Sequence, residues 1–140
     1  MGYLFDTDAI SELMRRRPSP AYVAWLAAIP REDQFASAVT LGELYYGAFR
    51  SAPDLRRFED IEARIVPSLN VLPVDLPVAR IFGRIRAELR SAGTPLEDAD
   101  LHIAATALHH GLELVTGNLR HFRRIPGLVL NPVLHDARTA

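Results

Sequence analysis

The segment Tyr3-Leu4-Phe5-Asp6-Thr7-Asp8 sets three apolar residues directly before two carboxylates. The apolar triplet predicts a short buried strand, and the pattern over 7–16 predicts a helix directly after it. Two roles fit Asp6. It caps that helix, which is a common position for aspartate, or it faces a ligand site, because such sites form at the carboxyl ends of strands in open parallel sheets. Asp8 fits the same two roles.

Short apolar runs alternate with helical patterns along the rest of the chain, which predicts an α/β domain with a parallel sheet between helices. The sequence contains no repeat, no low-complexity stretch and no long linker, so we expect a single domain over 1–140. Further strands are expected at 34–38, 71–72, 113–116 and 128–130, and further helices at 21–28, 41–50, 54–66, 78–91 and 98–110.

The composition excludes several classes of protein. The chain contains no cysteine, so it has neither a disulfide scaffold nor a thiolate zinc site. All 16 basic residues are arginines, so no lysine amine is present to act as a Schiff base or general base. The longest apolar run, over 21–29, is far shorter than the roughly 20 residues of a membrane span. We therefore expect a cytoplasmic protein that does not enter a membrane.

Asp100 is the least expected residue of the predicted helix 98–110. At about 100° per residue it shares a face with Ile103, Ala104 and Ala107, so its carboxylate lies in the middle of an apolar stripe. A carboxylate that faces a core is costly unless it is paired or binds a metal ion. Asp98 lies on a different face and is either the helix cap or a neighbour of an acidic site.

Two further polar segments have both a structural and a functional interpretation. Thr40-Leu41-Gly42-Glu43 fits the capping-box pattern, in which a hydroxyl residue and a glutamate three positions later cap a helix. Thr116-Gly117-Asn118 ends a predicted strand and forms either an ordinary turn or part of the same cleft edge as Asp6.

These polar residues belong to strand carboxyl ends or helix amino ends, which lie on one side of a parallel sheet. Converging carboxylates repel one another unless a divalent cation lies between them. Ligation by oxygen alone selects magnesium or manganese over zinc. None of the five histidines has zinc-type spacing with the acids, and His121 is the one nearest the predicted cleft.

The predicted helix 78–91 carries arginines on both sides of an apolar stripe, namely Arg80, Arg84, Arg86 and Arg90. One interpretation is a solvated helix whose arginine stems cover the edges of the core. The other is a basic wall beside a phosphate-bearing ligand.

Four segments of the chain contain these polar residues. They are Leu4-Phe5-Asp6-Thr7-Asp8, Thr40-Leu41-Gly42-Glu43-Leu44, Asp100-Leu101-His102-Ile103-Ala104-Ala105, and Leu114-Val115-Thr116-Gly117-Asn118 followed by His121-Phe122. In this order they resemble the motifs of PIN-domain nucleases. The resemblance implies a three-layer α/β/α fold with a central parallel sheet, and an endoribonuclease that depends on magnesium or manganese.

The resemblance also implies roles for individual residues. Asp6, Glu43 and Asp100 match the metal-binding acids, and Asn118 stands at a fourth catalytic position where the family often has a further acid. Asp8 stands where the family commonly has asparagine or serine, so we expect it to restore the charge lost at Asn118. The candidates for side chains that support the metal ligands are Thr7, Asp8, Asp98 and Thr116.

The size of the chain resembles the VapC-type toxins of toxin–antitoxin pairs, near the FitB-like branch. This implies a cognate VapB-type antitoxin, an RNA substrate and a homodimer, with Arg80, Arg84, Arg86 and Arg90 as candidates for gripping the RNA backbone. Trp25, Tyr45, Tyr46 and Phe49 lie either at an interface or in the core.

Two alternative functions remain open on the sequence. A PIN module with weak catalysis would act mainly by binding an antitoxin or RNA, because Asn118 replaces an acid. A phosphatase similar to the haloacid dehalogenases would use two aspartates with the spacing of Asp6 and Asp8, although those enzymes usually need a lysine.

Overall fold

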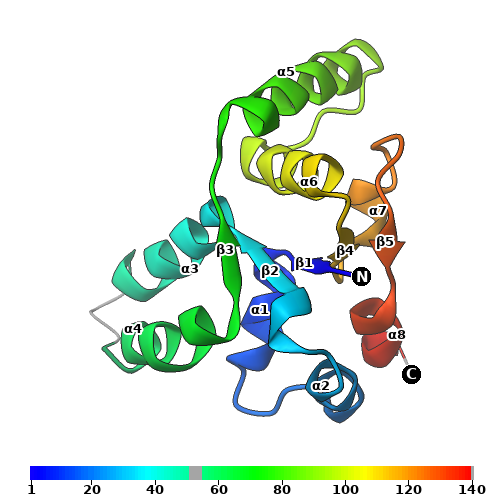
Figure 1. Cartoon of the computed structure of the whole chain (residues 1–140). Helices are drawn as coiled ribbons and strands as arrows, with labels where there is room; N and C mark the ends of the chain where they lie inside the picture. Colours follow the sequence, from blue (N-terminus) through cyan, green and yellow to red (C-terminus); the bar gives the residue numbers. More distant parts are fainter. Residues whose placement is uncertain (51–54, 140) are drawn as a thin grey trace.

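A five-stranded parallel sheet runs through the centre of the computed structural model, which describes residues 1–50 and 55–139 (Figure 1). The strand order is β3-β2-β1-β4-β5, and every pair of neighbours is parallel. The strands are β1 (Tyr3–Phe5), β2 (Gln34–Ser37), β3 (Asn70–Leu72), β4 (Glu113–Val115) and β5 (Leu130–Asn131).

The central strand β1 pairs with β2 on one side and with β4 on the other, so that Leu4 lies opposite Phe35 and Leu114. From β1 the chain first builds the β2–β3 half and then crosses to the β4–β5 half. The order therefore reverses between β1 and β4, and ligand sites of open α/β sheets form at such a point.

Helices cover both faces of the sheet (Figure 1). Helices α5 (Leu76–Ser91), α6 (Asp98–His110) and α7 (Leu119–Phe122) pack on one face. The other face carries α1 (Thr7–Leu13), α2 (Pro20–Ala27), α3 (Ala38–Arg50), α4 (Leu55–Asp60) and α8 (Val133–Thr139). The connections include the short helical turns Arg31–Asp33, Ile61–Ile65 and Val66–Ser68.

Two hydrophobic cores follow from the alternation of side chains along β1. Leu4 belongs to the core beneath α5 and α6, whereas Phe5 belongs to the core on the opposite face, and both are buried. Full burial of a large apolar side chain contributes roughly 1.5–3 kcal/mol, so each face is held by its own cluster. The predicted three-layer α/β/α arrangement is confirmed.

Several element boundaries differ from the prediction. Helix α3 begins at Ala38 rather than at Leu41, because the Ser37 hydroxyl accepts a hydrogen bond from the amide of Val39. The predicted helix over 54–66 is α4 followed by a wider π-helical turn, and its first residue lies outside the described residues. The last strand begins at Leu130, two residues later than predicted.

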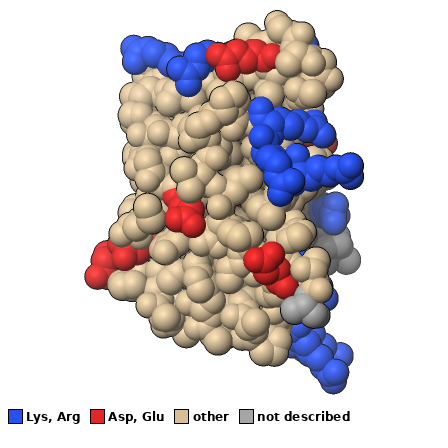
Figure 2. Space-filling model, turned by 90° about the vertical axis from the view of Figure 1, so that its right-hand side faces the viewer, with Lys and Arg blue, Asp and Glu red and all other residues tan. Residues whose placement is uncertain are grey.

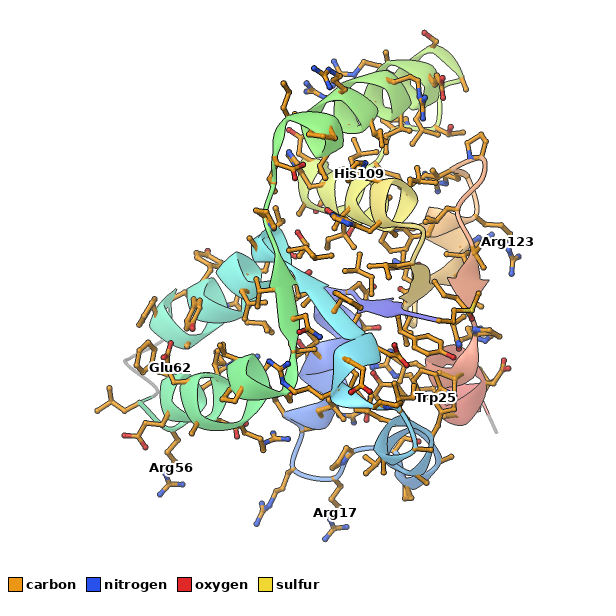
Figure 3. The ribbon with its side chains drawn as sticks, viewed as in Figure 1. Arg17, Trp25, Arg56, Glu62, His109 and Arg123 are labelled. Carbon is orange, nitrogen blue, oxygen red and sulfur yellow. The ribbon has the colours of Figure 1, made fainter. Side chains whose placement is uncertain are left out.

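The four aromatic residues named as interface candidates divide into two pairs. Trp25, labelled in Figure 3, packs edge-on against Tyr3 and is stacked on Tyr22, and Tyr45 packs against the same core. Tyr46 and Phe49 are 65% and 64% exposed, so their rings are open to a partner. Among residues 1–50 and 55–139, no helix is long and apolar enough to cross a membrane.

Candidate active site

Asp6 ends β1 and begins α1. Its carboxylate accepts a hydrogen bond of 2.7 Å from the amide of Ala9, so the capping interpretation is confirmed. The residue is only 5% exposed, and burial raises its pKa to about 7. Hydrogen bonds from Thr116 and Ala9 lower the pKa, whereas the charges of Asp8 and Asp100 raise it further. Asp6 is therefore a buried acid whose negative charge is poorly compensated.

Asp100 lies in the first turn of α6, with its side chain 29% exposed. Burial raises its pKa, the charge of Glu43 adds to the rise, and His121 opposes it. The Nδ1 atom of His121 lies 3.9 Å from the carboxylate. Although it stands on an otherwise apolar helix face, Asp100 is not inside the core. It lines a cavity at the edge of the sheet.

Glu43 does not form a capping box, because α3 begins before Thr40. The hydroxyl of Thr40 is buried and has no hydrogen-bond partner, so it cannot be capping the helix. Glu43 instead lies on the exposed side of α3, where it accepts a hydrogen bond from the hydroxyl of Thr7. Thr7 therefore ties the second acidic segment to the first.

These acids line one open cavity of about 360 Å³. Four distant stretches of the chain contribute to it, as expected for the carboxyl edge of the sheet. Its lining residues are Asp6, Thr7, Asp8, Ser11, Glu43, Asp100, Asn118 and Phe122.

The cavity has the donors that a hard divalent cation requires. The side chains of Asp6, Glu43, Asp100 and Asn118 supply oxygen atoms, which suit magnesium or manganese. In the parts of the chain that the structure describes, no three acidic or histidine side chains already stand in the close arrangement of a bound ion. The raised pKa values of Asp6 and Asp100 nevertheless indicate negative charge that a cation would stabilise.

Asn118 follows β4 and is held from two sides. Its backbone amide donates to the hydroxyl of Thr116 at 2.9 Å, and its side-chain nitrogen lies 2.9 Å from Nδ1 of His121. The amide oxygen is left as its potential ligand atom. His121, which sequence reasoning placed near the cleft, thus contacts Asn118 and lies close to Asp100.

Asp8 does not replace the acid missing at Asn118. Its two carboxylate oxygens accept hydrogen bonds of 2.7 Å and 3.0 Å from Arg138, which offsets part of its charge. The same ion pair argues against a phosphatase in which Asp8 acts as an acid. Sequence reasoning missed Arg138 because α8, which carries it, was not predicted.

Asp98 lies outside the cavity lining. Its side chain is 59% exposed and its carboxylate is 3.3 Å from Arg86, so it forms a surface ion pair between α6 and α5. The cap of α6 is Glu97, which makes no side-chain capping bond, so the cap interpretation of Asp98 is wrong.

The predicted RNA-binding arginines lie on α5, in the outer layer above α6 (Figure 1). They are exposed, and Arg84 lies 3.9 Å from Glu88 on the same helix. Another basic group follows Asn118: Arg120 and Arg123 are exposed, and Arg123 points outward in Figure 3. In the face drawn in Figure 2, basic side chains lie at the upper edge and along the right side, and acidic side chains are scattered between and below them. No hydrophobic periodicity in the sequence pointed to Arg120 and Arg123 as candidates for RNA contacts.

Comparisons with known proteins agree with this geometry. The model of the PIN domain family matches residues 3–128. The toxin FitB of Neisseria gonorrhoeae is 36% identical over 138 residues, which cover 95% of this chain and 99% of FitB. A VapC of Salmonella typhimurium, named a tRNA(fMet)-specific endonuclease, is 45% identical over 128 residues, covering 91% of this chain and 95% of that protein.

Solved structures give the same result. The FitAcB structure from Neisseria gonorrhoeae contains a chain with a TM-score of 0.82 and 36% identity, covering 93% of this chain and 97% of that one. The DNA-bound VapBC structure from Salmonella typhimurium gives a TM-score of 0.85 at 34% identity, covering 94% and 97%. PIN-domain nucleases in general depend on a divalent metal ion. The chain therefore belongs to the PIN-domain family, in the group of the VapC and FitB ribonuclease toxins.

Proposed function

We propose that the chain is an endoribonuclease toxin that hydrolyses RNA phosphodiester bonds in the acidic cavity and is neutralised by a VapB-type antitoxin. The observation that carries the proposal is the meeting of Asp6, Glu43 and Asp100, from three distant segments, at one cavity. Two of these acids have raised pKa values, which favours a cation-binding role over a purely structural one.

Magnesium or manganese is the proposed metal, with Asp6, Glu43 and Asp100 as its carboxylate ligands and the Asn118 amide oxygen beside them. Such an ion, when bound, lowers the pKa of a coordinated water and stabilises charge on the phosphate. The chain's own residues prepare the site. The amide of Ala9 donates a hydrogen bond to the Asp6 carboxylate, and the hydroxyl of Thr7 donates one to Glu43. The hydroxyl of Thr116 accepts a hydrogen bond from the backbone amide of Asn118.

RNA with accessible single-stranded loops is the proposed substrate, because unstacked bases are the usual targets of RNA recognition. The VapC relatives that are named tRNA(fMet)-specific endonucleases make initiator tRNA the first RNA to test. The outer-layer arginines of α5 remain candidates for contacts to the RNA backbone, and Arg120 and Arg123 are nearer to Asn118 in the chain.

The proposed partners follow from the relatives. The FitAcB and VapBC structures are toxin–antitoxin complexes, which supports an antitoxin partner for this chain. We also propose that residues 1–140 form one PIN domain and that the protein is a homodimer, for which exposed Tyr46 and Phe49 are available apolar contacts. The RNA substrate implies a site of action in the cytoplasm.

Replacement of Asp100 by asparagine tests the function directly. We expect Asp100→Asn to reduce cleavage of a single-stranded RNA and of initiator tRNA by at least about 1,000-fold, since one ligand charge is lost. The matched control is Glu59→Gln, which removes an exposed carboxylate on α4 and should leave cleavage unchanged. Chelation of divalent ions should abolish cleavage, and magnesium or manganese should restore it.

Two outcomes would contradict the proposal. Cleavage at the wild-type rate by purified Asp100→Asn would show that the cavity is not the active site. Tight RNA or antitoxin binding without any metal-dependent cleavage by the wild-type protein would instead favour the non-catalytic binding module.

A further inference from the structure

Arg138 is the centre of an ion-pair cluster that includes Asp8, one of the residues that line the acidic cavity. From α8 its guanidinium donates two hydrogen bonds to Asp8, at 2.7 Å and 3.0 Å, and two to Glu12, at 2.8 Å and 3.1 Å. Such a bidentate fork fixes geometry more strictly than a single ammonium contact does. Arg138 thus binds helix α1 through two of its residues.

Glu12, one of the two acceptors of Arg138, is itself held in place by several hydrogen bonds. It is only 1% exposed, and its second carboxylate oxygen accepts the amide of Ser19 at 2.9 Å. Arg15 also donates to it, at 3.2 Å. A buried carboxylate requires such partners, because an unpaired charge in the interior is strongly destabilising. Glu12 is therefore held by Ser19 and Arg15, which do not line the cavity.

The cluster also contacts the neighbouring turn, between β4 and α7. A Cβ atom added to Gly117 would overlap with both the guanidinium of Arg138 and the carboxylate of Asp8. Gly117 lies between Thr116, which hydrogen-bonds to Asp6, and the cavity residue Asn118. The ion pair thus lies between helix α1, whose N-cap is Asp6, and the turn that carries Asn118.

We propose that Arg138 is a positioning residue for RNA cleavage, which holds helix α1 against the β4–α7 turn and offsets the charge of Asp8. The inference rests on the proposed function of the cavity. Asp8 lines that cavity and its charge already acts on Asp6, so loss of Arg138 would remove the cation that offsets part of that charge. Arg138 therefore both aligns the acids and limits the negative charge of the site.

The two roles give opposite signatures in the Arg138→Gln variant. Loss of alignment should lower kcat about tenfold or more, because small displacements of catalytic groups are costly. The released charge of Asp8 should instead strengthen Mn²⁺ binding, measured by calorimetry without RNA, about threefold to tenfold. The KM for RNA should change less than kcat. A purely structural residue would weaken both metal binding and turnover.

Three further variants complete the test. Arg138→Lys keeps the charge without the fork, so it should restore wild-type Mn²⁺ affinity but only part of kcat. Adding Asp8→Asn to Arg138→Gln should return Mn²⁺ affinity to the wild-type value. Arg15→Gln is the matched control, because Arg15 contacts Glu12 but not the cavity residue Asp8, and it should leave both quantities unchanged.

Folding is measured for each variant, and Arg138→Gln is repeated in a Glu12→Gln background, which removes the buried charge. The inference is wrong if folded Arg138→Gln binds Mn²⁺ and cleaves RNA as the wild type does. It is also wrong if Arg15→Gln changes Mn²⁺ affinity and kcat as much as Arg138→Gln does. Failure of the proposed function is recognised separately, because the wild type would then show no metal-dependent cleavage, or Asp6→Asn would retain both Mn²⁺ binding and cleavage.

Discussion

Asp6 and Glu12 lie at the two ends of the short helix α1, and they titrate in opposite directions. Both are almost completely buried, at 5% and 1% exposure. Burial raises the pKa of Asp6 to about 7. Burial alone would also raise the pKa of Glu12, but hydrogen bonds from Arg138, the Ser19 amide and Arg15 outweigh it, so that pKa is lowered.

The difference between the two acids lies in their partners and not in their depth. The carboxylate of Glu12 pairs with two arginines and stabilises the fold. The carboxylate of Asp6 is hydrogen-bonded to a backbone amide and a hydroxyl, and it faces a cavity with other acids. A buried carboxylate without a cationic partner is a candidate for cation binding, and one with arginines is a structural anchor.

The largest effect is expected for Asp6→Asn. Asparagine can still accept the hydrogen bond from Ala9, so the cap of α1 is preserved. RNA cleavage should fall by at least about 1,000-fold because a metal ligand is lost. The melting temperature in the absence of metal should stay the same or rise, since an uncompensated buried charge is removed. A large drop in melting temperature would place Asp6 in the structural class with Glu12.

Glu12→Gln should behave in the opposite way. Hydrogen bonds to charged groups contribute about 1.5–3 kcal/mol, so the free energy of unfolding at pH 7 should fall by that amount. The folded-state pKa of Glu12 lies below the ordinary value of a glutamate side chain. Its stabilisation is therefore complete above that value and is lost as the pH falls through the folded-state pKa. Denaturant titrations should show the two proteins converging in acid, and a constant difference at all pH values would contradict this account.

Gly117→Ala tests whether the two regions are packed against each other. The added methyl group would force Arg138 and Asp8 apart, with an expected loss of about 1–3 kcal/mol of stability. The matched control is Gly83→Ala in α5, where the new Cβ would lie in open space. That variant should gain roughly 0.5–1 kcal/mol from the better helix propensity of alanine. Equal effects at the two glycines would show that the turn is not tightly packed.

The smallest effect is expected for Asn118→Asp. A carboxylate at this exposed position adds one negative charge to the cavity and should strengthen Mn²⁺ binding by about threefold to tenfold. Calorimetry measures the change directly. Unchanged affinity would mean that Asn118 does not face the cation, and would restrict the ligands to the three acids.

The sequence predicted the strands and the main helices because their hydrophobic patterns are local. Tyr3-Leu4-Phe5 and the apolar stripe around Asp100 needed no distant partner to be recognised. Gly111, which closes α6 in the left-handed conformation with φ of 63°, was likewise visible as a local signal. The convergence of Asp6, Glu43 and Asp100 followed from the rule that strand ends share one edge.

The arginine partners could not be predicted in this way. Arg138 and Asp8 are 130 residues apart, and no spacing rule links them. The helix that carries Arg138 is only seven residues long, too short for a clear amphipathic pattern. The capping box at Glu43 failed for a related reason, because Ser37 began the helix earlier than the pattern suggested.

The sheet topology has a consequence for the cell that makes this toxin. Asp6 is translated about a hundred residues before its neighbouring strand β4 and the acid of α6. Contacts of such large sequence separation form late in folding. A nascent chain that ends before α6 therefore cannot assemble the acidic cavity, because Asp100 and Asn118, which line it, are missing.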